Sequence, residues 1–257
     1  MTELKVRYSS SNPRGKVTVI LGSSLGTDRN MWNEQLQLLP VDWNVVGFDL
    51  RGHGMSPLSP RTPTIEDFAD DVIGIADELR VDRFAFCGLS IGGAIGQSLA
   101  GRYPERVSSL VLASTGLTIL SRQGLIDRSV KVLAEGTGWV ADVSSTRWFT
   151  ADFRREHPEI VDAKMQHLRR MEPRAYSDAC LALSEFDGHA SASNIVAPTL
   201  VLAGDEDVAT PAAGGAELAG AITGAELRIL PDSSHLCNVE QPQLFTDLLR
   251  EHVEAHR

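Results

Sequence analysis

Residues 84–93 read Phe-Ala-Phe-Cys-Gly-Leu-Ser-Ile-Gly-Gly, an apolar run in which glycines flank a single serine. This pattern predicts a buried strand, a tight turn at Ser90 and a helix over residues 94–103. Gly88 and Gly92 are small enough to let the turn close. Such a turn holds its serine in a strained backbone conformation with the hydroxyl at the sheet edge, so Ser90 is the candidate nucleophile.

The segments on both sides of this turn alternate between short apolar runs and helical patterns. Such alternation is typical of an α/β fold with a mostly parallel, doubly wound sheet, whose ligands bind at the carboxyl ends of the strands. Besides the strand before Ser90, strands are expected at residues 17–21, 45–49, 107–113, 197–203 and 225–230, and helices at residues 31–39, 65–79 and 242–254. Residues 4–8 and the turn at 12–15 predict a hairpin-like start.

The pattern changes between residues 114 and 194, where helical patterns follow one another without a convincing β-branched run. Helices are expected there at residues 123–133, 140–148, 159–171 and 174–183. The sequence therefore predicts a core domain formed by residues 1–113 and 195–257, with residues 114–194 inserted as a helical lid.

Composition restricts the classes of protein that fit. The 257 residues are 42% hydrophobic, which is enough to bury a full core. No apolar run reaches the length of a membrane span and the N-terminus lacks a signal-peptide layout, so we expect a cytoplasmic protein without a membrane role. The net charge of −10 argues against nucleic acid, and it means that an anionic substrate would need local cationic groups. Three cysteines without metal-ligand spacing predict free thiols and no metal site.

A serine hydroxyl is a weak nucleophile at neutral pH, so it needs a base to take its proton and an acid to orient that base. His235 and Asp207 each follow a late predicted strand, and the order serine, acid, histidine is the one expected for this architecture. Asp205 is the rival acid, but it lies nearer the strand end. His53 lies between two glycines and is interpreted as a residue that holds its loop.

Acyl transfer also requires backbone N–H donors for the oxyanion that forms at the attacked carbonyl. The N–H of Ile91, directly after the serine, is one candidate. The small residues at 22–26 follow a predicted strand and could direct the N–H of Leu25 to the same point. The alternative is that this loop is a plain turn.

These motifs resemble those of a known family. The chain resembles the α/β-hydrolases in Arg-Gly-His-Gly at 51–54, Gly-Leu-Ser-Ile-Gly-Gly at 88–93, Gly-x-x-Asp at 204–207 and Ser-His at 234–235. More narrowly, it is similar to the 3-oxoadipate enol-lactonases in Ser-Ser-Leu-Gly-Thr-Asp at 23–28, Met-Trp at 31–32, Arg-Trp-Phe-Thr at 147–150 and His-Leu-Cys-Asn-Val-Glu at 235–240. The general resemblance covers nearly the whole chain.

The resemblance implies a serine hydrolase with an α/β-hydrolase fold that converts 3-oxoadipate enol-lactone to 3-oxoadipate in aromatic compound catabolism, without a metal or organic cofactor. Its substrate would be a small lactone that carries a carboxylate. Arg128 matches an arginine of the enol-lactonases and would pair with that carboxylate, unless it is a surface arginine. Trp148 would form an apolar wall over the ring. The alternatives are a general carboxylesterase or carbon–carbon bond hydrolase on the same triad, and a hydrolase fold that only binds a ligand.

Overall fold

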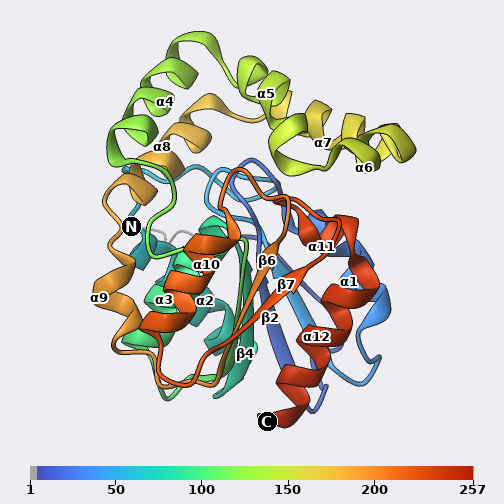
Figure 1. Cartoon of the computed structure of the whole chain (residues 1–257). Coiled ribbons are helices and arrows are strands. Elements are labelled where there is room, and N and C mark those ends of the chain that lie inside the picture. Colours follow the sequence, from blue (N-terminus) through green and yellow to red (C-terminus); the bar gives the residue numbers. More distant parts are fainter. Residues whose placement is uncertain (1–4, 257) are drawn as a thin grey trace.

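The computed structural model describes residues 5–256. Within that range the chain forms a seven-stranded sheet in the order β1-β3-β2-β4-β5-β6-β7 (Figure 1). β1 is antiparallel to β3, and every other neighbouring pair is parallel. The strands are β1 (Tyr8–Ser10), β2 (Thr18–Gly22), β3 (Asn44–Phe48), β4 (Phe84–Leu89), β5 (Val107–Ala113), β6 (Thr199–Gly204) and β7 (Glu226–Leu230). The predicted mostly parallel sheet is confirmed.

Helices cover both faces of this sheet (Figure 1). α1 (Asn33–Leu38) and α12 (Pro242–Ala255) pack together on one face, while α2 (Ile65–Glu78), α3 (Ile91–Arg102) and α10 (Ala212–Ala221) cover the other. The first ten residues of α3 are all buried, so this helix is held rigidly against the sheet. Within residues 5–256, every helix is too short or too polar to cross a lipid bilayer.

The first strand differs from the prediction. It forms no hairpin with β2; instead it pairs with β3, with Tyr8 opposite Phe48. The reason is topological, because β2 pairs with β3 on one side and with β4 on the other and has no free edge. Residue 4 of the predicted segment lies outside the described residues.

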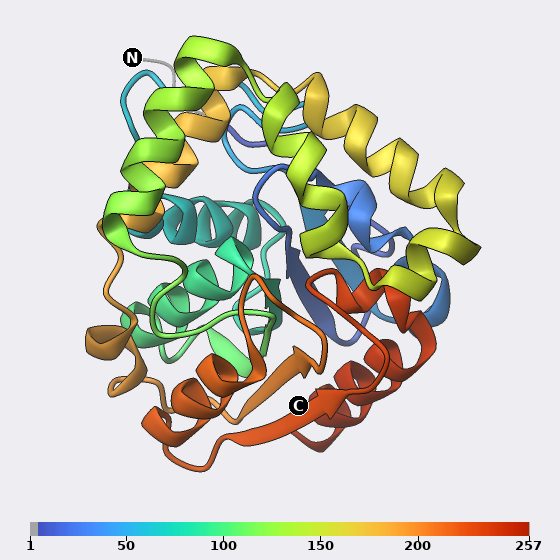
Figure 2. The ribbon, with the colours of Figure 1, turned by 45° about the horizontal axis from the view of Figure 1, so that its top comes forward.

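Helices connect β5 to β6, as the periodicity predicted. They are α4 (Arg122–Glu135), α5 (Gly138–Trp148), α6 (Ala151–Glu156), α7 (Pro158–Arg169), α8 (Pro173–Ser184) and α9 (Gly188–Ala192). α4 to α8 lie over one end of the sheet, where α4 packs along α8 and α5 along α7 (Figures 1 and 2). The short α6 and α9 were not predicted, since five or six residues show too little periodicity. α9 belongs to the segment predicted as the lid, but it packs on α3 beside the sheet. The division of the chain at residues 113 and 195 therefore stays a prediction.

Candidate active site

Ser90 lies on a sharp turn between β4 and α3. Its φ of 61° and ψ of −115° form a positive-φ conformation that is strained for a residue with a side chain. A Cβ added to Gly88 would lie 2.0 Å from the Gly92 carbonyl oxygen, and one added to Gly92 would lie 2.2 Å from the Gly22 carbonyl oxygen. The turn therefore requires both glycines of the motif, as the sequence indicated.

His235 and Asp207 meet in the loops that follow β7 and β6. The Nδ1 atom of His235 lies 2.9 Å from Oδ2 of Asp207, and both side chains are almost fully buried. Asp205 is engaged elsewhere, because its Oδ1 accepts the N–H of Ser233 at 3.2 Å. The geometry thus favours Asp207 over Asp205 as the partner of the histidine.

The Asp207 carboxylate is also held by its own loop. Its Oδ1 accepts the N–H groups of Ala209 and Thr210 at 2.7 and 2.9 Å, and its Oδ2 accepts the Thr210 hydroxyl at 2.6 Å. Burial by itself raises the pKa of Asp207, but the charge and hydrogen bond of His235 and the Thr210 donors outweigh burial, so the pKa lies below its ordinary value. The ionised carboxylate can then accept a hydrogen bond from a protonated Nδ1 of His235, which leaves Nε2 of the same ring unprotonated and able to act as a base.

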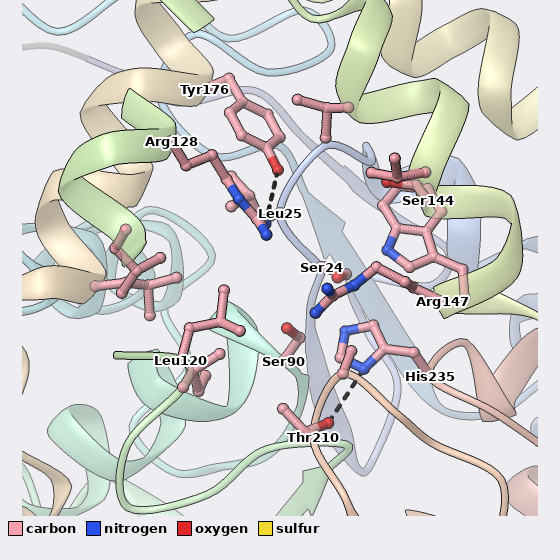
Figure 3. A pocket seen from close by; sticks show the side chains of 17 residues that line it. Ser24, Leu25, Ser90, Leu120, Arg128, Ser144, Arg147, Tyr176, Thr210 and His235 are labelled. Atoms are coloured by element: carbon pink, nitrogen blue, oxygen red, sulfur yellow. Dashed lines mark hydrogen bonds between the residues drawn. The ribbon is translucent and has the colours of Figure 1, made fainter. Parts of the chain in front are cut away.

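Ser90 and His235 both line a pocket under the lid (Figure 3). Its walls come from the loop after β2, from α4, α5 and α8, and from the loops after β6 and β7. Within residues 5–256, no hydrogen bond joins the Ser90 hydroxyl to the His235 ring. Such contacts often tighten only when a substrate binds, so the pair stays a candidate nucleophile and base.

The lid is tied to the loop of the candidate base at the corner between α5 and α6. The N–H of Leu236 donates to the Trp148 carbonyl oxygen at 3.0 Å. The buried carboxylate of Glu240 accepts the N–H of Ser234 at 2.6 Å and the N–H of Thr150 at 2.8 Å. These contacts fix one wall of the pocket relative to the histidine loop.

The candidate oxyanion donors are the backbone N–H groups of Leu25 and Ile91. Ile91 is the first residue of α3, so its N–H has no acceptor inside the helix. Leu25 lines the pocket, and its loop is held by the N–H and hydroxyl of Thr27, which both donate to the Ser24 carbonyl oxygen. No described residue accepts a hydrogen bond from the N–H of Leu25 or Ile91, so both amides stay free to bind a ligand oxygen.

Arg128 from α4 and Arg147 from α5 both reach into the pocket (Figure 3). Nη1 of Arg128 lies 3.5 Å from the Tyr176 hydroxyl, and neither guanidinium has a carboxylate partner among residues 5–256. Burial and the neighbouring charge of Arg128 lower the pKa of Arg147, as expected when two cations are held together away from water. Trp148, which is buried, adds an apolar side to the pocket.

Comparisons with known proteins identify the family. The family described as serine aminopeptidase, S33, matches residues 36–242, which is most of the chain. The chain belongs to this family of α/β-hydrolases.

Relatives of the hydrolase carry different substrate names. This chain is 34% identical over 243 residues to 3-oxoadipate enol-lactonase 2 of Acinetobacter baylyi, and the match covers 95% of this chain and 91% of that protein. It is 32% identical over 244 residues to a protein of Rhizobium rhizogenes named as a candidate carbamate hydrolase, RutD, covering 93% of each. The structure is also similar to the solved structure of the enol-lactonase from Burkholderia xenovorans LB400, with a TM-score of 0.93 and 35% sequence identity. The match covers 97% of this chain and 96% of that one.

The other residues singled out from the sequence do not line the pocket. His53 is buried, its Nδ1 lies 3.2 Å from the Arg51 carbonyl oxygen, and burial lowers its pKa to about 4, in agreement with a residue that holds its loop. Cys87, Cys180 and Cys237 are free and buried, as predicted. Within residues 5–256, no group of three or more His, Cys, Asp or Glu side chains is arranged to hold a metal ion.

Sequence reasoning missed several side chains of the hydrolase pocket, above all Arg147, Tyr176 and Thr210. A signal for Arg147 was available, because residues 140, 144 and 147 follow helical spacing and face the pocket from α5. Thr210 carried no such signal, since it lies in a loop. Its position becomes clear only when Asp207 and His235 are brought together.

Proposed function

We propose that this α/β-hydrolase is a serine hydrolase that opens the ring of 3-oxoadipate enol-lactone to give 3-oxoadipate. Ser90 is the nucleophile, His235 is the general base, and Asp207 orients the base. The strained turn at Ser90 and the 2.9 Å contact between His235 and Asp207 support these roles. The enol-lactonase names of two similar proteins support the substrate.

The reaction proceeds by acyl transfer to water. The Ser90 hydroxyl attacks the ring carbonyl carbon while Nε2 of His235 takes its proton, and the N–H groups of Leu25 and Ile91 bind the oxyanion. The bond between the acyl carbon and the ring oxygen then breaks, and the enol stays tethered to the serine through the acyl group. Water activated by the same histidine releases the acid, and the free enol relaxes to its ketone.

The observation that carries the choice of substrate is the pair of guanidinium groups of Arg128 and Arg147, which have no carboxylate within ion-pair distance among residues 5–256. The protein has a net charge of −10, so its long-range field repels an anion, yet Arg128 and Arg147 place two positive charges in the pocket. Removing such charges from water without a partner is costly. The acetate arm of the lactone supplies the missing carboxylate, and Trp148 then forms an apolar wall over the ring.

A carbamate hydrolase is the second candidate, because a relative with 32% identity carries that name. Carbamate is an anion and would also pair with the arginines. However, it is too small to fill the apolar part of the pocket formed by Ile119, Leu125 and Trp148. A protein that only binds a ligand is disfavoured, since binding alone requires neither a strained serine nor an oriented histidine.

Steady-state kinetics on three substrates separates these functions. We expect kcat/KM to be highest for 3-oxoadipate enol-lactone, lower for the uncharged phenyl acetate, and lowest for carbamate. Equal or faster turnover of phenyl acetate would indicate a general carboxylesterase. If no substrate is turned over and a serine-reactive phosphonate does not label the protein, the fold serves only for binding.

A further inference from the structure

The mechanism above does not use Thr210, although its side chain touches both partners of the nucleophile. The Thr210 hydroxyl lies 3.1 Å from His235 Nδ1 (Figure 3). It also lies 2.6 Å from Asp207 Oδ2, which is itself 2.9 Å from His235 Nδ1. All three side chains are buried, and those of Thr210 and His235 line the pocket. Their polar atoms therefore form a closed triangle.

The protons of this triangle can be assigned from the chemistry of the groups. A threonine hydroxyl has one proton to donate, and an ionised carboxylate is its strongest available acceptor. Once the Thr210 proton is given to Asp207, the hydroxyl oxygen can only accept a hydrogen bond from His235 Nδ1. Both neighbours of Nδ1 then act as acceptors, so the ring is held with a proton on Nδ1 and with Nε2 unprotonated.

We propose that Thr210 is a positioning residue of the hydrolytic site, which holds His235 in the tautomer and orientation that accept the Ser90 proton. The main chain of Thr210 fixes it in place, because its N–H donates to Asp207 Oδ1 at 2.9 Å. Thr210 thus donates a hydrogen bond to each carboxylate oxygen of Asp207, and its hydroxyl also contacts the imidazole of His235. The inference rests on the proposed roles of Ser90, His235 and Asp207, but it is independent of the substrate.

The test measures how fast a serine-reactive phosphonate labels Ser90. Thr210→Val keeps the shape of the side chain without its hydroxyl, whereas Thr210→Ser retains the hydroxyl. We expect the labelling rate of Thr210→Val to fall about tenfold. Thr210→Ser should restore the rate, and phenyl acetate hydrolysis by Thr210→Val should lose kcat with little change in KM.

Thr246→Val is the matched control, because the Thr246 hydroxyl is also buried and donates to the Pro242 carbonyl oxygen at 2.6 Å, but on α12. Its labelling rate should equal that of the wild type. If Thr210→Val does not fold, Thr210→Ala is measured in its place with the same expectations.

Wild-type labelling of Thr210→Val would overturn the inference. So would a slow rate that Thr210→Ser does not restore, because that result indicates a purely structural role. Rapid labelling of Ser90→Ala would instead overturn the proposed function, because it would show that Ser90 is not the nucleophile. The proposed role of Thr210 would then lose its premise.

Discussion

Replacing Arg128 by methionine removes one of the two positive charges that the pocket offers to an anionic substrate. The change should leave the fold intact. The Arg128 guanidinium has no carboxylate partner among residues 5–256, and its contact with the Tyr176 hydroxyl is long at 3.5 Å. Its charge also opposes that of Arg147, whose pKa is lowered by burial and by Arg128, so its removal relieves a repulsion.

The expected loss follows from the interaction that is removed. A hydrogen bond between charged groups contributes roughly 1.5 to 3 kcal/mol, which corresponds to about one to two orders of magnitude in an equilibrium constant. The carboxylate of the proposed lactone substrate carries the same charge before and during the reaction, so the loss should appear as a higher KM with a nearly unchanged kcat. Because Arg147 remains, the lower half of that range is expected.

Steady-state kinetics on 3-oxoadipate enol-lactone and on phenyl acetate measures this loss. Arg122→Met is the matched control, since Arg122 begins the same helix but is exposed and pairs with Glu185 at 2.5 Å. Arg128→Met should raise KM for the lactone only, and Arg122→Met should change neither substrate. Equal losses on both substrates would show that Arg128 is structural, and no loss on either would show that the carboxylate is held elsewhere.

The remaining predictions concern the triad and the lid. Ser90→Ala should lower kcat/KM on the order of a millionfold while circular dichroism stays unchanged, and a folded variant that keeps more than roughly a few percent of the activity would exclude Ser90 as the nucleophile. Asp207→Asn should lower kcat/KM on the order of a thousandfold or more, and Asp205→Asn far less, because only Asp207 contacts the histidine; the reverse order would mean that the wrong carboxylate is assigned. Glu240→Gln should lower the free energy of unfolding in urea by roughly 1.5 to 3 kcal/mol, since an amide has one carbonyl oxygen for two N–H donors. The exposed Glu226→Gln is its control and should change that free energy by less than about 0.5 kcal/mol, so equal values for the two variants would contradict the role of Glu240.

Local sterics explain why the turn at Ser90 could be predicted from the sequence. Gly88 and Gly92 lie where a Cβ would collide with carbonyl oxygens, so the requirement of the turn is visible in the residues themselves. The four longer lid helices, α4, α5, α7 and α8, were predicted within a few residues for the same reason, because their periodicity is local. The partner of β1 was not, since Tyr8 pairs with Phe48 and no short-range signal records that choice.

The pocket residues that escaped prediction depend on tertiary placement. Arg147 was noted only as part of a motif, and its approach to Arg128 depends on how α5 lies beside α4. Thr210 is three residues from Asp207, but nothing in its loop sequence shows that its hydroxyl turns back to meet both the carboxylate and His235. Sequence order could place the three candidate triad members in separate loops, whereas only the folded chain shows what surrounds them.

The proposed mechanism requires that Ser90 form an acyl-enzyme with 3-oxoadipate enol-lactone. Rapid acid quenching during turnover, followed by mass mapping of the peptides, detects this intermediate. Because the ring opens without losing a fragment, we predict that the peptide containing Ser90 gains the full mass of the lactone, and that the Ser90→Ala variant shows neither this gain nor turnover. The proposed mechanism would be contradicted if the protein did not consume the lactone, if the adduct lay on another residue, or if Ser90→Ala consumed the lactone at the wild-type rate.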